Sequence, residues 1–359
     1  MSETVFIFGA GFSAPAGMPV QADIMSNVLR RKSQDVVRAT YQTLFSMVDP
    51  DEMEGIPLED VFTMLDRARH SGETIRGLNH TQIRNSYDAL IKAVAHEFNR
   101  RLMNFDPLPY ASFFSALVSR RLGTGSQREQ AADPFAILTL NWDTIPDFMI
   151  AKSAANSDVA VDYACYDYDL EAASGHLPSI LKKAKGKFNI KLLKLHGSLN
   201  WLVCTCCGRL FSQRQEGGRP LVAMPETEEC RFCKGVALEN LIITPSLVKD
   251  IGQTHLKMVW HNALMDLQEA KRLVFVGYSF PQADFEFRYI LLKAITSHDD
   301  LRIRVVLYPP DILCVTEQQK WQRDEVENRY TNFFGQRDID FKFLDAQNFM
   351  LDPSLIWDW

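Results

Sequence analysis

Short apolar runs alternate with helical stripes along most of this chain. The first run, Thr4–Phe8, is β-branched and aromatic and ends at Gly9, which predicts a buried strand followed by a turn. Similar runs recur after residue 134 and predict further strands. Because these runs are apolar almost throughout, they favour a parallel sheet covered on both faces. They are Phe135–Leu140, Lys191–Leu195, Leu241–Ile243, Leu273–Val276, Arg304–Leu307 and Ile339–Phe343.

Between the first two predicted strands, apolar residues recur at spacings of three and four. This stripe predicts helices over Pro57–Arg69, Ile83–Leu102 and Ser112–Leu122, with their apolar faces in the core. Three more helices are predicted among the later strands, over Ser179–Lys187, His255–Lys271 and Ala283–Thr296. The alternation indicates an α/β fold, a Rossmann-like doubly wound parallel sheet.

This sheet is interrupted by two predicted insertions. The Rossmann-like domain comprises residues 1–20 and 131–359, and a helical insertion occupies residues 21–130. A small cysteine-bearing module, residues 202–238, is inserted in the Rossmann-like domain.

The composition and charge of the chain argue against some classes of function. The chain has 359 residues, 46% of them hydrophobic and 23% charged, as in soluble globular proteins. Its net charge of −6 argues against direct binding of nucleic acid, which needs clustered cations. No apolar run approaches the length of a membrane span, and Glu3 is the only charge before Asp23, so the first strand lacks the basic start of a signal peptide. We expect a cytoplasmic protein that does not bind membranes.

Five of the seven cysteines lie within thirty residues, which indicates a metal site in a reducing compartment. Two Cys-x2-Cys pairs, each followed by a glycine, can place four thiolates around one ion. We predict a structural Zn²⁺ site, with Cys206 left over and Cys204, Cys207, Cys230 and Cys233 as ligands.

Four further motifs follow predicted strands. Gly-Ala-Gly-Phe-Ser at residues 9–13 can let a phosphate approach the backbone, although a plain turn explains it about equally well. Asn141 and Asp143, after the second strand, offer groups for a ribose and a carboxamide, or simply close a turn. His196, before Gly197, is a candidate general base. Gly-Tyr-Ser at residues 277–279 suits a nucleotide contact or a turn.

In this order, the motifs resemble those of the sirtuin superfamily: Gly-Ala-Gly-x-Ser, Thr-x-Asn-x-Asp, His-Gly, paired cysteine knuckles and Gly-x-Ser. The resemblance implies that NAD⁺ is bound and cleaved between nicotinamide and ribose. It implies His196, Asn141 and Asp143 as the catalytic set. It also implies NAD contacts from eight residues in the matching motifs, namely Gly9, Ala10, Gly11, Ser13, Thr139, Gly277, Tyr278 and Ser279.

Departures from the deacylase pattern favour water as the acceptor of the ribose. The Asp and Arg that follow the first motif in deacylases are missing after Pro19, and Leu140 replaces a glutamine. The peptide-pairing Phe-Gly-Glu segment is replaced by Ile243–Ser246. The helical insertion resembles the bacterial sirtuin-like branch associated with phage defence. That branch implies an NAD⁺ glycohydrolase that is gated by homo-oligomerisation or by a partner such as a HerA-type ATPase.

Three alternatives stay open, one of them an ADP-ribosyltransferase. The retained zinc module, which many of those hydrolases lack, favours an NAD-dependent protein-lysine deacylase. A chain that binds NAD without turnover would instead be a scaffold subunit.

Overall fold

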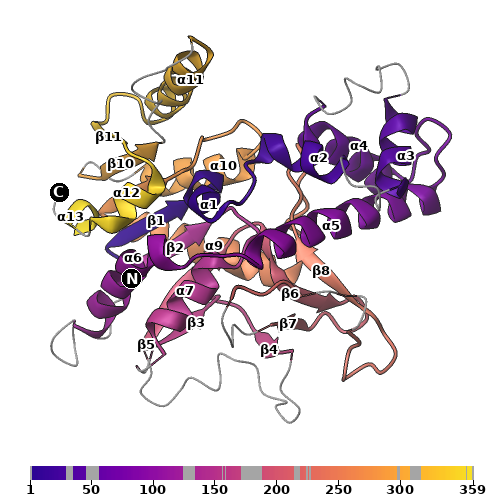
Figure 1. Ribbon diagram of the computed structural model, residues 1–359, viewed down its shortest axis with the longest axis horizontal. Helices are drawn as coiled ribbons and strands as arrows, with labels where there is room; N and C mark the ends of the chain where they lie inside the picture. Colours follow the sequence, from indigo (N-terminus) through magenta and orange to yellow (C-terminus); the bar gives the residue numbers. More distant parts are fainter. Residues whose placement is uncertain are drawn as a thin grey trace.

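The computed structural model describes residues 2–29, 35–45, 56–123, 134–155, 157, 159–170, 188–213, 219–223, 225, 228–296, 300–307, 317–352 and 354–357. Within these residues, none of the helices combines the length and apolarity that a bilayer crossing requires. The structure has a central sheet flanked by helices, a helical lobe on one side and a small second sheet below (Figure 1).

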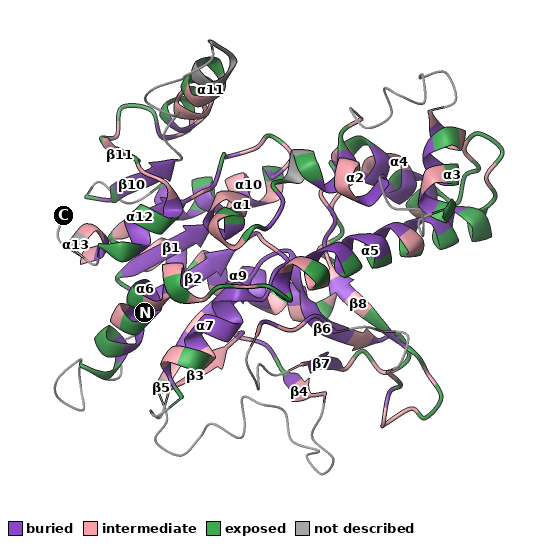
Figure 2. Cartoon of the chain, in the orientation of Figure 1, coloured by how far each residue is buried: buried purple, intermediate pink, exposed green. Residues whose placement is uncertain are grey.

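The central sheet has seven strands, and every neighbouring pair in it is parallel, as predicted. Its five inner strands are buried over most of their length, the two edge strands are only partly buried, and helices cover both faces (Figure 2). From edge to edge the order is β11 (Ile339–Phe343), β10 (Arg302–Leu307), β9 (Arg272–Val276), β1 (Thr4–Phe8), β2 (Phe135–Thr139), β5 (Phe188–Lys194) and β3 (Val159–Asp162).

The strand order reverses beside β1. The chain passes from β1 to β2 and on to β3 and β5 on one side, then returns to place β9 on the other side of β1. Open parallel sheets bind ligands at such a switch point, beyond the carboxyl ends of the strands. The turns that follow β1 and β9 therefore face the same crevice.

A second sheet of four strands lies beside the first. Its order is β4 (Asp167–Asp169), β7 (Leu210–Ser212), β6 (Gly197–Cys204) and β8 (Leu238–Ile242). The prediction that the run at 241–243 joins the parallel sheet was wrong, because β8 pairs antiparallel with β6. Glu239 is exposed between two buried leucines, so β8 is only half covered. Pattern alone does not assign a strand to one of two sheets.

The helical lobe is formed by α2 (Gln21–Leu29), α3 (Asp35–Leu44), α4 (Leu58–Ser71) and the long α5 (His80–Leu102) (Figure 1). The helices predicted at 57–69 and 83–102 are confirmed by α4 and α5. Asn79 and Gln82 form a reciprocal capping box that starts α5. The predicted helix at 112–122 is α6 (Leu108–Leu122), which begins four residues earlier and packs on the sheet-covering helices.

The remaining helices cover the central sheet. Those predicted at 255–271 and 283–296 are confirmed as α9 (Thr254–Glu269) and α10 (Phe285–Ile295), and the one predicted at 179–187 lies outside the described residues. The others were not predicted. They are α1 (Ala10–Ser13), the 3-10 turn η1 (Ala14–Ala16), α7 (Ile145–Ser153), α11 (Glu317–Phe334), α12 (Ala346–Leu351) and α13 (Ser354–Trp357).

Candidate functional site

A cavity of about 700 Å³ opens at the switch point, at the carboxyl ends of β1, β2 and β9. The turns after these strands form its floor, and the helical lobe supplies part of its wall through Ile24, Glu59 and Phe98. The cavity brings together ten residues from the four motifs that follow predicted strands. They are Gly9, Ala10, Gly11, Ser13, Asn141, Asp143, His196, Gly277, Tyr278 and Ser279. Thr139 is fully buried and lies outside the lining.

The glycines after β1 and β9 allow two turns to pack backbone against backbone. The Gly11 N–H donates to the Gly277 carbonyl at 2.8 Å. Gly277 has a φ of +62°, and a Cβ there would lie 2.2 Å from the nitrogen of Phe12. A Cβ on Gly9 would lie 2.5 Å from the Cα of Tyr278. Contact between the turns therefore requires glycine at these positions, independently of any ligand.

Asn141, Ser13 and Asp143 form one hydrogen-bonded cluster on the cavity floor. The Asn141 amide donates to the Gly9 carbonyl at 2.8 Å and to Ser13 Oγ at 3.1 Å, which leaves its Oδ1 for a ligand. Ser13 donates in turn to Asp143 Oδ2 at 2.7 Å, while Asp143 Oδ1 accepts the Ile145 N–H at 3.0 Å. Burial raises the pKa of Asp143, and the Ser13 bond opposes that rise.

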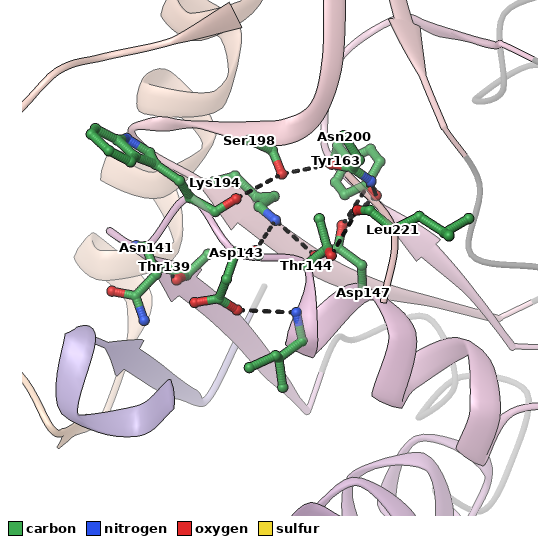
Figure 3. A network of polar contacts seen from close by, with 12 residues as sticks. Thr139, Asn141, Asp143, Thr144, Asp147, Tyr163, Lys194, Ser198, Asn200 and Leu221 are labelled. Carbon is green, nitrogen blue, oxygen red and sulfur yellow. Dashed lines mark hydrogen bonds and ion pairs between the residues drawn. The ribbon is translucent and has the colours of Figure 1, made fainter. Parts of the chain in front are cut away.

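A buried polar network holds the loop that carries Asn141 and Asp143 (Figure 3). Lys194, fully buried, donates to the Asp143 carbonyl at 2.8 Å and to Asp147 Oδ2 at 2.7 Å. Tyr163 donates to the other Asp147 oxygen, and Asn200 approaches that tyrosine hydroxyl at 3.3 Å. Because a buried ammonium needs a partner, Lys194 at the end of β5 fixes the loop after β2 and Asp147 of α7 against the central sheet.

His196 sits at the junction of the two sheets. Gly197 has a φ of +72°, and a Cβ there would lie 2.1 Å from the Leu241 carbonyl oxygen, so glycine lets β6 approach β8. His196 Nδ1 lies 3.0 Å from the Leu140 carbonyl oxygen. Nε2 is buried and has no hydrogen-bond partner in the described structure. Burial, with help from the charge of Lys249, lowers the pKa of His196 to about 4, so the ring is neutral at pH 7.

Asp284 and Lys249 complete this corner, and neither was predicted from the sequence. Asp284 Oδ1 lies 3.7 Å from His196 Nε2 and accepts a hydrogen bond from Lys249. Tyr278 donates to Asp284 Oδ2 at 2.9 Å. Burial alone would raise the pKa of Asp284, but the nearby His196 and Lys249 and the bonds from Lys249 and Tyr278 hold it below its usual value. The only feature of the sequence that could have indicated Asp284 is its position, five residues beyond Ser279 and at the start of a predicted helix.

The segment after β8 is bound to the helical lobe. Thr244 Oγ1 donates to the buried Asp66 of α4 at 2.8 Å, and the Leu247 N–H donates to Thr63 of α4 at 2.9 Å. The Ile243 N–H donates to the His196 carbonyl at 2.8 Å. Polar groups of this segment are thus already paired within the chain.

The four predicted zinc ligands come together beside the second sheet. The sulfurs of Cys204, Cys207, Cys230 and Cys233 all lie within 4.8 Å of one another, and Cys206 is exposed outside the group. Cys207 Sγ and Cys230 Sγ are 3.7 Å apart, close to the ~3.8 Å edge of a tetrahedron with Zn–S bonds of about 2.3 Å. Four thiolates with this spacing fit a closed structural Zn²⁺ site.

We expect one zinc ion per chain, and we expect the module to depend on it. Its apolar cluster is small, with six buried members among the described residues: Leu202, Cys204, Phe211, Ala223, Cys230 and Leu238. Such a core gives little stability without a metal. Elemental analysis should find zinc at one equivalent in the wild type and far less after Cys230→Ser. Cys206→Ser is the matched control and should keep the metal; equal zinc loss in both variants would contradict the assignment.

Comparison with known proteins adds only weak likenesses. No protein-family model and no curated protein matches this chain. A Sir2 homologue in complex with NAD gives a TM-score of 0.41 at 13% identity, over 92% of this chain and 90% of that chain. Sir2 bound to an inhibitor, 2′-O-acetyl-ADP-ribose and a deacetylated p53 peptide gives 0.41 at 13%, over 98% and 92%. Because both TM-scores are below 0.5, the fold assignment rests on the strand order and pairing described above.

Proposed function

We propose that this chain is a sirtuin-like NAD⁺ glycohydrolase that cleaves the nicotinamide–ribose bond with water as the acceptor. The observation that supports it best is the cavity at the switch point, where the glycine turn after β1, the free Oδ1 of Asn141 and the neutral His196 face one space. The turn would bind the pyrophosphate, and Asn141 and His196 would face the nicotinamide ribose.

In this proposal the residues have separate roles. The Gly9–Ser13 turn would lie against the phosphates, and Gly277 and Ser279 would line the opposite side. The N–H groups of Gly9, Gly11 and Phe12 are bonded within the chain, so the other polar groups of the turn would contact the phosphates. Asn141 Oδ1 would accept a hydrogen bond from a hydroxyl of the nicotinamide ribose and so hold the ribose for attack. Neutral His196 would take the proton as general base while nicotinamide departs with the bonding electrons. Asp143, with both oxygens already bonded, would act by fixing Ser13 and the floor.

Water is favoured over an acyl-lysine because of the segment after β8. Acyl-peptide binding by strand addition needs free backbone groups on this segment. Here the Leu247 N–H is bound to Thr63 and the Ile243 N–H to the His196 carbonyl. The zinc module is the feature that favours the deacylase alternative, since it would frame a peptide groove.

Product analysis separates these functions. The purified protein is incubated with NAD⁺, with and without an acetyl-lysine peptide pool, and nicotinamide, ADP-ribose and acyl-ADP-ribose are quantified. We expect equal nicotinamide and ADP-ribose without peptide. Acyl-ADP-ribose formed only with peptide would establish the deacylase instead. If the protein binds ADP-ribose but does not cleave NAD⁺, even with a partner present, the chain is better explained as a scaffold subunit.

The pKa of His196 predicts an acidic limit to activity. A general base must be neutral, so kcat/KM should be flat near pH 7 and fall as the pH drops through about 4. The folded pKa lies below the ordinary value of 6.5, so the neutral ring contributes stability that is complete above pH 6.5 and is lost as the pH falls towards 4. Rate and unfolding profiles from about pH 3 to 8 test both predictions. His196→Gln should lack this loss of stability, and a kcat/KM midpoint near 6.5 would contradict the burial argument.

We further propose that activity is gated by homo-oligomerisation or by a HerA-type ATPase partner, and that the enzyme acts in antiphage defence in the cytoplasm. The physical reason is that unrestrained NAD⁺ hydrolysis would deplete the host cell. The product analysis should therefore include the candidate partner.

A further inference from the structure

Two hydrogen-bond acceptors face each other at the corner of the cavity formed by His196 and Asp284. His196 Nδ1 lies against a carbonyl oxygen, which only accepts, so Nδ1 carries the ring proton and Nε2 presents a lone pair. The Asp284 carboxylate, held ionised by Lys249 and Tyr278, also only accepts. Nε2 and Oδ1 are 3.7 Å apart, which is too far for a direct hydrogen bond.

This arrangement is complementary to a group with two protons on one atom. A water molecule about 2.8 Å from both acceptors can donate one proton to each. An alcohol carries only one such proton and leaves one acceptor unsatisfied, which costs free energy in a buried site. His196 is 7% exposed and Asp284 is also 7% exposed, so bulk water does not substitute freely for the missing bond.

We propose that His196 Nε2 and Asp284 Oδ1 together bind the water molecule that attacks the ribose, which makes Asp284 a further catalytic residue. This inference rests on the proposed NAD⁺ hydrolysis. The water oxygen forms a bond to C1′ of the ribose as the C1′–N bond breaks, and both electrons of that bond leave with neutral nicotinamide. One water proton passes to His196 Nε2, and the other stays on the new 1′-hydroxyl of ADP-ribose.

Lys249 and Tyr278 act as positioning residues for Asp284. The Lys249 ammonium also donates to the Ala283 carbonyl at 2.8 Å. Two acceptors, this carbonyl and Asp284 Oδ1, therefore hold the ammonium in place. The Tyr278 hydroxyl fixes the other oxygen, Oδ2, at 2.9 Å. With Oδ2 bound to Tyr278, the Oδ1 lone pairs not used by Lys249 remain for the water.

The test compares Asp284→Asn with the wild type in methanol–water mixtures containing NAD⁺. An asparagine amide can donate to Nε2 and so removes the paired-acceptor site. We expect kcat for hydrolysis to fall about 100-fold or more, while the Kd for ADP-ribose stays within about threefold of wild type. The ratio of methyl-ADP-ribose to ADP-ribose should rise, because the variant no longer favours a two-proton donor. A purely structural role would lower both products together.

Two further variants make the result decisive. Asp284→Glu keeps the charge beside Lys249 but moves the oxygens, and should change the product ratio in the same direction. Asp250→Asn removes an exposed carboxylate and should change nothing. If the wild type releases nicotinamide but the Asp284 variants keep its rate and product ratio, the paired-acceptor site is refuted and the hydrolase stands. If the wild type releases no nicotinamide even with the candidate partner present, the proposed function itself is refuted.

Discussion

Replacing His196 by alanine is expected to reduce NAD⁺ hydrolysis by about 10²–10⁴-fold, the usual contribution of a general base. The ring is neutral at pH 7 and its Nε2 has no hydrogen-bond partner among the described residues, so the substitution removes a proton acceptor from the cavity. ADP-ribose affinity should change little, because the turn that we propose to bind the phosphates follows β1, away from His196. Nicotinamide release measured at saturating NAD⁺, with ADP-ribose titration alongside, provides the comparison.

The matched control is His261→Ala, which removes an exposed histidine on α9 and should keep full activity. Full activity in His196→Ala would mean that another group accepts the proton. An equal loss of ADP-ribose binding and turnover would indicate that His196 holds the ligand rather than the proton.

Replacing Gly277 by alanine is expected to cost the fold about 2–5 kcal/mol. A left-handed backbone costs a non-glycine residue about 1–2 kcal/mol, and overpacking adds about 1–3 kcal/mol. The overpacking arises because the new Cβ would lie 2.2 Å from the Phe12 nitrogen, in the contact between the two turns.

Comparison with Gly17→Ala separates the steric part of the Gly277→Ala cost from the backbone part. Gly17 has a φ of +72°, but a Cβ there meets nothing within 4 Å, so only the backbone cost of about 1–2 kcal/mol applies. Urea unfolding of both variants measures the difference. Equal losses would show that the turns after β1 and β9 can separate without cost, which the structure contradicts.

Much of the fold follows from local pattern. The nearly all-apolar runs identify strands of the parallel sheet, and the three- and four-residue spacings identify α4 and α5. Helix α7 was missed because its residues Ile145–Ile150 are all buried, so it shows no polar face. Its contribution to the site, Asp147, could therefore not be placed from the sequence.

The candidate site was predictable where its residues follow strands. Ser13, Asn141 and His196 meet in one cavity because the carboxyl ends of parallel strands share an edge. Asp284 and Lys249 could not be found in this way, since their approach to His196 depends on how α10 and the segment after β8 pack. A lysine at the end of an apolar run is expected at the surface, yet Lys194 is fully buried and paired with Asp147.

The central claim is that the cavity between the ends of β1 and β9 binds NAD⁺ with its nicotinamide ribose beside His196. A crystal structure of the protein with ADP-ribose tests it most directly. We predict the pyrophosphate at the Gly9–Ser13 turn and the ribose C1′ end facing Asn141 Oδ1 and His196 Nε2. ADP-ribose bound outside this cavity, or with its adenine end beside His196, would contradict the account.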